Sequence, residues 1–143
     1  MNILLPASPN EALELIPLFV YGTLRNGGDL HAQLMPYIRS GAVPATITGR
    51  LAKAAAGDWP VLLEASGSDQ FVIGEVYLVD ASSLLLLLTE ELLYGYSLTW
   101  AKVRSEQGFG WAVVCNWPWT EGFDEVIPHG DWLRYLAERV RSN

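Results

Sequence analysis

The sequence predicts an α+β fold: a small mixed, partly closed β-barrel flanked by a few helices. Two observations lead to this prediction. Segments typical of strands outnumber those typical of helices, and no regular alternation of strand and helix persists along the chain. A length of 143 residues suits one domain, so residues 1–143 are expected to form a single domain.

The predicted strands are short apolar runs or segments in which apolar and small polar residues alternate. Residues 42–51 show this alternation, which is typical of a half-buried strand. Turn signals separate the strands, and Gln107-Gly108 indicates a hairpin. The strands are expected at about 18–21, 41–53, 59–64, 71–79, 97–106 and 110–117.

Helices are predicted at about 29–37, from Asp80 or Ser82 to about Leu93, and at 131–142. Asp80 and Ser82 can both cap the second helix, because their side chains accept hydrogen bonds from the free N–H groups of a first turn. The leucines of this helix cover several of its faces, so it is expected to be buried or to contact a second subunit, which allows a homodimer. Residues 1–17 contain three prolines and are expected to form an N-terminal arm or a short helical turn.

Composition argues against several classes of protein. Half of the residues are hydrophobic and 17% are charged, as in a globular protein. The net charge of −7 repels phosphate backbones, so no nucleic-acid partner is expected. The apolar run Leu84–Leu88 is far shorter than the ~20 residues of a membrane span, and the chain starts without a signal sequence. A cytoplasmic location away from membranes is therefore expected. Cys115 is the single cysteine and is more readily a buried hydrophobic residue than a nucleophile.

The most informative segment runs from Leu18 to Arg25. An apolar strand ends there in a tight turn, Tyr21-Gly22-Thr23-Leu24, which a polar loop follows. Such a turn can leave backbone N–H groups unpaired and directed into one space, where they bind carboxylates or carbonyl oxygens. The alternative is a plain connection in which Gly22 only permits the turn, through the positive φ that glycine tolerates.

Further stretches give this segment a context. Together with Tyr21-Gly22-Thr23-Leu24-Arg25 they resemble, over about residues 16–135, the gamma-glutamylcyclotransferase-like superfamily with its AIG2-like and BtrG-like branches. The family's fold is a small barrel. The stretches that carry the resemblance, in chain order, are Gly49-Arg50-Leu51, Trp59-Pro60-Val61-Leu62, Val72-Ile73-Gly74-Glu75-Val76-Tyr77, Trp111-Ala112-Val113-Val114 and Ile127-Pro128-His129-Gly130-Asp131-Trp132.

The resemblance implies a substrate cavity beside the Tyr-Gly-Thr-Leu turn, with backbone N–H groups holding a gamma-glutamyl group. Trp100-Ala101-Lys102 stands where the family has Tyr-x-Arg, and Glu75 matches the glutamate of its Gly-Glu strand. The implied substrate-binding residues are Tyr21, Gly22, Thr23, Leu24, Arg25, Trp59, Pro60 and Trp100.

The family's catalytic glutamate lies late in the helix that follows the Gly-Glu-x-Tyr strand. Two registers are open here. One places Glu91 at that position, with Glu90 as the neighbour if the register differs, and the other places Leu92 there and removes the catalytic group. A glutamate in a partly apolar cavity is suited to this role, because desolvation raises its pKa toward working pH.

The resemblance therefore implies a gamma-glutamyl cyclotransferase that acts on a gamma-glutamyl amine or peptide and releases 5-oxoproline and the free amine. The alternative is a non-catalytic member that binds a small metabolite or a protein in the same cavity. No metal or organic cofactor is expected, because the chain has no clustered His/Cys set, phosphate-binding glycine loop or nucleotide fingerprint.

Overall fold

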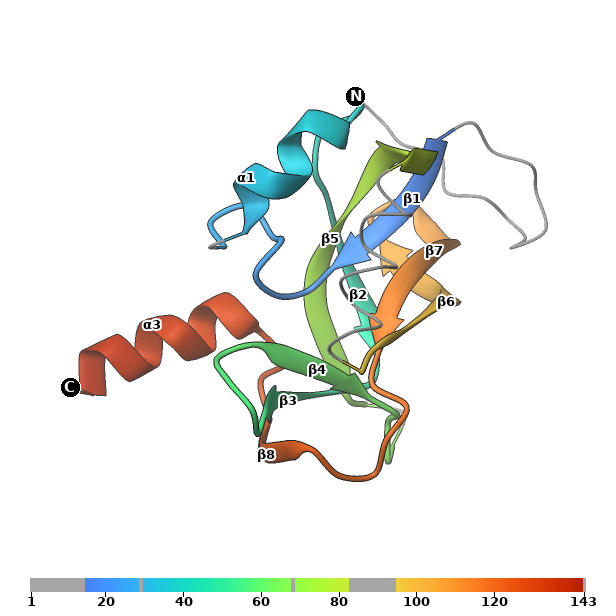
Figure 1. Ribbon diagram of the computed structural model, residues 1–143. Helices are drawn as coiled ribbons and strands as arrows, with labels where there is room; N and C mark the ends of the chain where they lie inside the picture. Colours follow the sequence, from blue (N-terminus) through green and yellow to red (C-terminus); the bar gives the residue numbers. More distant parts are fainter. Residues whose placement is uncertain (1–14, 29, 68, 83–94, 143) are drawn as a thin grey trace.

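The computed structural model describes residues 15–28, 30–67, 69–82 and 95–142, and its centre is a closed five-stranded barrel. The strand order is β1-β5-β2-β6-β7 (Figure 1). All neighbouring pairs are antiparallel except β1 and β7, which run parallel and close the barrel where Leu18 pairs with Val113. The barrel strands are β1 (Leu15–Val20), β2 (Val43–Thr48), β5 (Phe71–Asp80), β6 (Ser97–Ser105) and β7 (Gly108–Asn116). The predicted α+β barrel is confirmed.

A second sheet lies below the barrel in the view of Figure 1, in the order β4-β3-β8. Its strands are β3 (Arg50–Ala54), β4 (Pro60–Leu63) and β8 (Phe123–Ile127). The single strand predicted over 41–53 is wrong: the chain breaks at Gly49, and β2 joins the barrel while β3 joins the second sheet. β8 was not predicted, because most of its residues are exposed and it lacks an apolar alternation.

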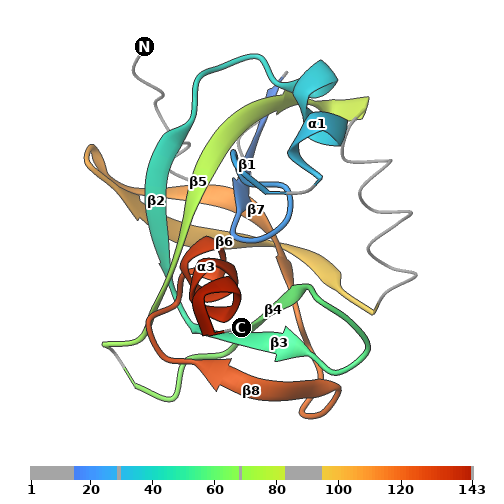
Figure 2. The ribbon, with the colours of Figure 1, turned by 90° about the vertical axis from the view of Figure 1, so that its left-hand side faces the viewer.

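Two helical regions of the described chain have complete bounds. α1 (His31–Leu34) continues into the 3₁₀ turn η1 (Met35–Tyr37), so the helix predicted over 29–37 is shorter and changes type where Pro36 enters it. α3 (Trp132–Ser142) begins one residue after the predicted start (Figure 2). No helix in the described ranges is long and apolar enough to cross a membrane.

Two predictions concern segments that are described only in part. β1 begins at Leu15, so residues 15–17 of the expected N-terminal arm belong to the barrel, while residues 1–14 lie outside the described residues. Residues 83–94, which include most of the predicted leucine-rich helix, also lie outside the described residues.

Strand β1 is buried on both faces, which fixes the turn that follows it. Phe19 and Tyr21 point into the barrel core, which Trp132 of α3 completes. Leu18 and Val20 pack on the other face with Leu34 of α1. Burial of apolar side chains on both faces stabilises the strand by roughly 1.5–3 kcal/mol per large residue, so the end of β1 is a firm base for a site.

Candidate active site

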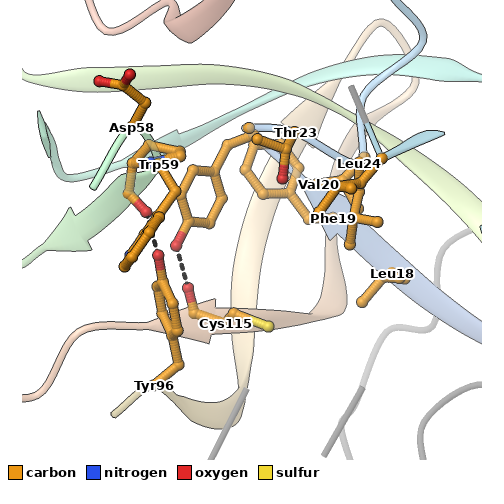
Figure 3. A pocket seen from close by; sticks show the side chains of 13 residues that line it. Leu18, Phe19, Val20, Thr23, Leu24, Asp58, Trp59, Tyr96 and Cys115 are labelled. Carbon is orange, nitrogen blue, oxygen red and sulfur yellow. Dashed lines mark hydrogen bonds between the residues drawn. The ribbon is translucent and has the colours of Figure 1, made fainter. Parts of the chain in front are cut away.

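A cavity of about 300 Å³ lies at the end of β1, in the size range of small-molecule sites (Figure 3). It is bounded by β1, the turn after it, the start of β4, Tyr96 before β6 and Cys115 at the end of β7. The lining is mostly apolar. The described residues that form it are Leu18, Phe19, Val20, Tyr21, Gly22, Thr23, Leu24, Leu30, Asp58, Trp59, Pro60, Tyr96 and Cys115.

The turn after β1 lines the cavity and contains backbone hydrogen-bond donors without a partner in the described chain. The Arg25 N–H donates to the Gly22 carbonyl at 3.0 Å and closes the turn, and the Leu30 N–H donates to the Thr23 carbonyl at 2.8 Å. In such a turn the N–H groups of the two central residues have no partner within the turn. Those of Thr23 and Leu24 form no hydrogen bond to any other residue in the described part of the chain. Unpaired N–H groups of this kind bind anionic or carbonyl oxygens.

Gly22 is required by a close approach and not by its backbone conformation. A Cβ atom placed on Gly22 would lie 2.4 Å from Cγ of Pro60, which no side chain tolerates without a shift. The expectation of a positive φ at Gly22 is wrong, because Gly22 is absent from the positive-φ glycines of the described chain. The turn therefore packs directly on the first residue of β4.

Two tyrosines fix the walls of the cavity. The Tyr21 hydroxyl donates to the carbonyl of Cys115, and the Tyr96 hydroxyl donates to the carbonyl of Pro60 (Figure 3). Both side chains are buried, so these bonds tie β1 to β7 and β4 to the start of β6 in an environment with little water. The cavity is thus held open by hydrogen-bonded walls.

Few charges face the cavity. Asp58 has the only carboxylate among the described lining residues, and it lies at the rim with this carboxylate directed away from Thr23 and Cys115 (Figure 3). This carboxylate accepts a hydrogen bond from Arg139 of α3 at 3.1 Å and is 68% exposed. Cys115 is half-buried in the cavity wall, where the sequence favoured a fully buried thiol.

A polar brace supports the turn from behind, formed by Arg25, Glu75 and Asp131. Arg25 Nη1 donates to Asp131 Oδ1 at 2.9 Å, and its Nε lies 4.0 Å from Glu75 Oε1. The same Glu75 oxygen accepts the Asn26 N–H at 2.6 Å. Asp131 also caps α3, since Oδ1 accepts the N–H of Arg134 at 3.2 Å. The brace connects the turn to β5 and to α3.

Tyr77 lies beside this brace. Burial, followed by the negative charge of the neighbouring Glu75 and a hydrogen bond to it, raises the pKa of Tyr77 to about 12. The phenol therefore stays neutral over the whole physiological range.

Comparison with known proteins identifies the family. Residues 18–134 match the family model described as "Gamma-glutamyl cyclotransferase, AIG2-like". The chain belongs to this AIG2-like family. None of the curated proteins matches it.

Solved structures of similar proteins share the fold. YkqA from Bacillus subtilis is 26% identical with a TM-score of 0.70, over 90% of this chain and 43% of the Bacillus chain. The chain thus spans less than half the length of that protein. An uncharacterized protein from Pyrococcus horikoshii is 26% identical with a TM-score of 0.65, over 88% and 97% of the two chains. An AIG2-like protein from Mus musculus, at 24% identity and a TM-score of 0.64 over 83% and 95%, shows the same fold.

The structure brings most of the predicted substrate-binding residues of this AIG2-like chain to one cavity. Tyr21, Gly22, Thr23 and Leu24 line it, as do Trp59 and Pro60 from the start of β4. Their contact with a substrate stays a prediction.

Two predicted binding residues lie elsewhere. Arg25 belongs to the brace, and Trp100 packs against the apolar cluster around Leu18 and Val113. The residues proposed for catalysis, Glu91 and Glu90, and the alternative Leu92 lie outside the described residues. Within the described residues, no group of three or more His, Cys, Asp or Glu side chains could hold a metal ion.

Sequence reasoning did not select Tyr96 and Asp58. Asp58 directly precedes the predicted pair Trp59-Pro60, so its position at the rim follows from theirs. Tyr96 comes before β6, and the register that pairs Ser97 with Asn116 brings it beside Cys115 and Trp117. That register is a long-range property that no local sequence signal carries.

Proposed function

We propose that this chain is a gamma-glutamyl cyclotransferase that acts on a gamma-glutamyl amine or peptide. The observation that carries the proposal is the turn at residues 22–25: Thr23 and Leu24 line a cavity of substrate size, and their N–H groups have no hydrogen-bond partner among the described residues. Membership in the AIG2-like family supports the reaction class.

In the proposed reaction the nucleophile is part of the substrate. The free α-amine attacks the γ-carbonyl carbon and forms the five-membered ring of 5-oxoproline. The bond from that carbon to the nitrogen of the leaving amine then breaks, and this amine takes up a proton. The protein must fold the substrate back on itself, accept the proton of the attacking amine and stabilise the oxyanion. The N–H groups of Thr23 and Leu24 are suited to the oxyanion, since they are fixed before the substrate arrives.

The proton acceptor is proposed to be Glu91, with Glu90 as the neighbouring alternative. The general base is proposed to come from a residue outside the described lining. Asp58, the carboxylate within that lining, is exposed at the rim and pairs with Arg139. A carboxylate that enters this mostly apolar cavity would have a raised pKa, as a general base near neutral pH requires.

A non-catalytic binding protein is the second candidate. The mostly apolar lining and the outward carboxylate of Asp58 favour it, because the described walls bind a ligand but provide no base. In this case Leu92 would occupy the position of the catalytic glutamate, and the cavity would hold a small metabolite.

Incubation with a panel of gamma-glutamyl amines and peptides, scored for 5-oxoproline, distinguishes the two candidates. Glu91→Gln is expected to lower turnover by ~10²–10⁴-fold, because the amide keeps the shape and loses the basic oxygen. Glu90→Gln is the matched control and is expected to change little, since adjacent helix positions point about 100° apart. Saturable binding of these compounds without any 5-oxoproline would instead support the binding protein.

A further inference from the structure

A second cavity, of about 490 Å³, lies on the other side of β7 from the candidate active site. Successive strand residues point to opposite faces, so Cys115 lines the first cavity while Val114 and Asn116 line the second. The chain after β7, which passes round the lower end of the molecule in Figure 1, forms one wall. The described lining is Ile47, Thr48, Arg50, Leu62, Leu63, Glu64, Thr99, Ala101, Val114, Asn116, Trp117, Pro118, Trp119, Thr120 and Phe123.

The indole rings of Trp117 and Trp119 give this cavity fixed aromatic walls. Trp117 Nε1 donates to the Glu121 carbonyl at 2.8 Å, and Trp119 Nε1 donates to the Gly95 carbonyl at 2.9 Å. Trp117 also packs edge-on against Tyr96, with ring centroids 5.4 Å apart. Trp119 nevertheless remains 57% exposed. A large, oriented and exposed indole is a ready surface for a flat ligand, because little side-chain freedom is lost on binding.

Arg50, which lines the second cavity, differs from the other Lys and Arg side chains that the structure describes. It is half-buried, and its Nε donates to the Glu64 carbonyl at 2.9 Å, which orients the guanidinium group. Within the described chain it has neither a carboxylate partner nor an aromatic ring beneath it. The other Lys and Arg residues whose side chains the structure describes have one or the other: Arg25, Arg39, Lys53, Arg134 and Arg139 pair with carboxylates, while Lys102 and Arg104 lie over Phe109.

Asn116 adds a second donor to the cavity. Its Oδ1 accepts the Ser97 hydroxyl at 2.5 Å, so its NH₂ group remains available as a donor. Glu64 is the only acid among the described lining residues, and its side chain is exposed. The lining of the cavity therefore combines flat aromatic side chains with hydrogen-bond donors, one of which is the charged guanidinium group of Arg50.

We propose that this second cavity binds a small aromatic carboxylate, with the ring against Trp119 and the carboxylate on Arg50. A guanidinium group matches a carboxylate with two parallel hydrogen bonds, which are stronger than neutral ones. The apolar floor formed by Ile47, Leu62 and Val114 suits the ring. The site is separate from the proposed cyclotransferase reaction and does not depend on it.

The test uses 2-naphthoate and its neutral analogue 2-naphthamide as probes, with calorimetry for affinity and the Trp119 indole N–H resonance for location. Wild-type protein is expected to bind 2-naphthoate about 10- to 100-fold more tightly than 2-naphthamide, which is the range of a charge-assisted contact. Arg50→Gln is expected to remove this preference and leave 2-naphthamide binding unchanged. Trp119→Ala is expected to weaken both probes.

Two further variants sharpen the result. Glu64→Gln is expected to strengthen 2-naphthoate binding, because it removes a negative charge from the cavity rim. Arg104→Gln is the matched control, since Arg104 lies outside the cavity, and it is expected to change neither affinity. Circular dichroism confirms that each variant is folded. Equal affinities of the wild type for the two probes, an unchanged preference in folded Arg50→Gln, or no shift of the Trp119 resonance would overturn the proposal.

Discussion

Residues 21–24 and Arg25 are neighbours in the sequence, yet they serve the cavity in different ways. The first four line it, while Arg25 turns away and joins Glu75 and Asp131 in the brace. The turn closed between Gly22 and Arg25 produces this division. One short motif thus contains both the wall of a site and the support that holds it. It also explains why the Gly-Glu and Gly-Asp-Trp stretches accompany the turn in one chain: they provide the partners of Arg25.

The brace is expected to matter most for stability. Arg25→Met leaves the carboxylates of Glu75 and Asp131 without their shared cation, in a region where the Arg25 side chain is only 13% exposed. The free energy of unfolding is expected to fall by about 2–4 kcal/mol, between the values for exposed and buried pairs. Urea unfolding measures it. Arg39→Met is the matched control, because Arg39 pairs with Asp80 while 45% exposed, and it should cost under about 1 kcal/mol. Equal losses for the two variants would show that Arg25 is an ordinary surface cation.

The cavity wall at Gly22 is expected to be destabilised by a larger side chain. Gly22→Val would force a side chain into Pro60, and overpacking of this kind costs about 1–3 kcal/mol. The same substitution at Gly41, where a Cβ atom meets nothing within 4 Å, is the control and should change stability little. Thermal unfolding of both variants compares them. A Gly22→Val protein as stable as Gly41→Val would mean that the turn does not pack on β4.

A smaller effect is expected from the hydroxyl groups of the wall. Tyr96→Phe removes the hydrogen bond to the Pro60 carbonyl, and such a bond contributes about 0.5–1.5 kcal/mol. Tyr37→Phe is the control, because no hydrogen bond joins the Tyr37 hydroxyl to the described part of the chain, and it should be neutral. If both variants unfold alike in urea, the Tyr96 hydroxyl does not hold the cavity wall.

The sequence predicted the barrel and most of the cavity wall, because both depend on local signals. Alternation and short apolar runs marked the strands, and a turn after an apolar strand marked residues 21–24. The break at Gly49 was missed since β2 and β3 are nearly continuous in sequence and separate only through their partners. β8 was missed because a mostly exposed edge strand has no buried face to produce a pattern.

Two residues predicted to bind substrate, Arg25 and Trp100, are not among the described lining residues, and long-range contacts set their positions. Arg25 was predicted to contact substrate, but its partners Glu75 and Asp131 come from β5 and from the cap of α3. Trp100 was predicted at the cavity, but its strand position turns it toward the cluster that contains Leu34. Neither outcome follows from the residues adjacent to Arg25 or Trp100, because each requires the barrel to have closed first.

The ionisation of Tyr77 reports on the brace without disturbing it at neutral pH. The pKa of Tyr77 is raised from 10.0 to about 12, first by burial and then by the Glu75 carboxylate. The folded protein therefore holds this proton more tightly than the unfolded chain does. Its contribution to stability is complete below pH ~10 and is lost as the pH rises toward 12.

Tyrosinate absorbance after a rapid pH jump should show one group ionising near pH 12 that Tyr77→Phe removes. Glu75→Gln should lower the Tyr77 midpoint toward 10.0. The ionisation midpoint of Tyr135, whose pKa is raised by burial and by Glu125, should not change. A Tyr77 midpoint that Glu75→Gln leaves unchanged would mean that burial alone raises the pKa and that the Glu75 carboxylate has no electrostatic effect on Tyr77.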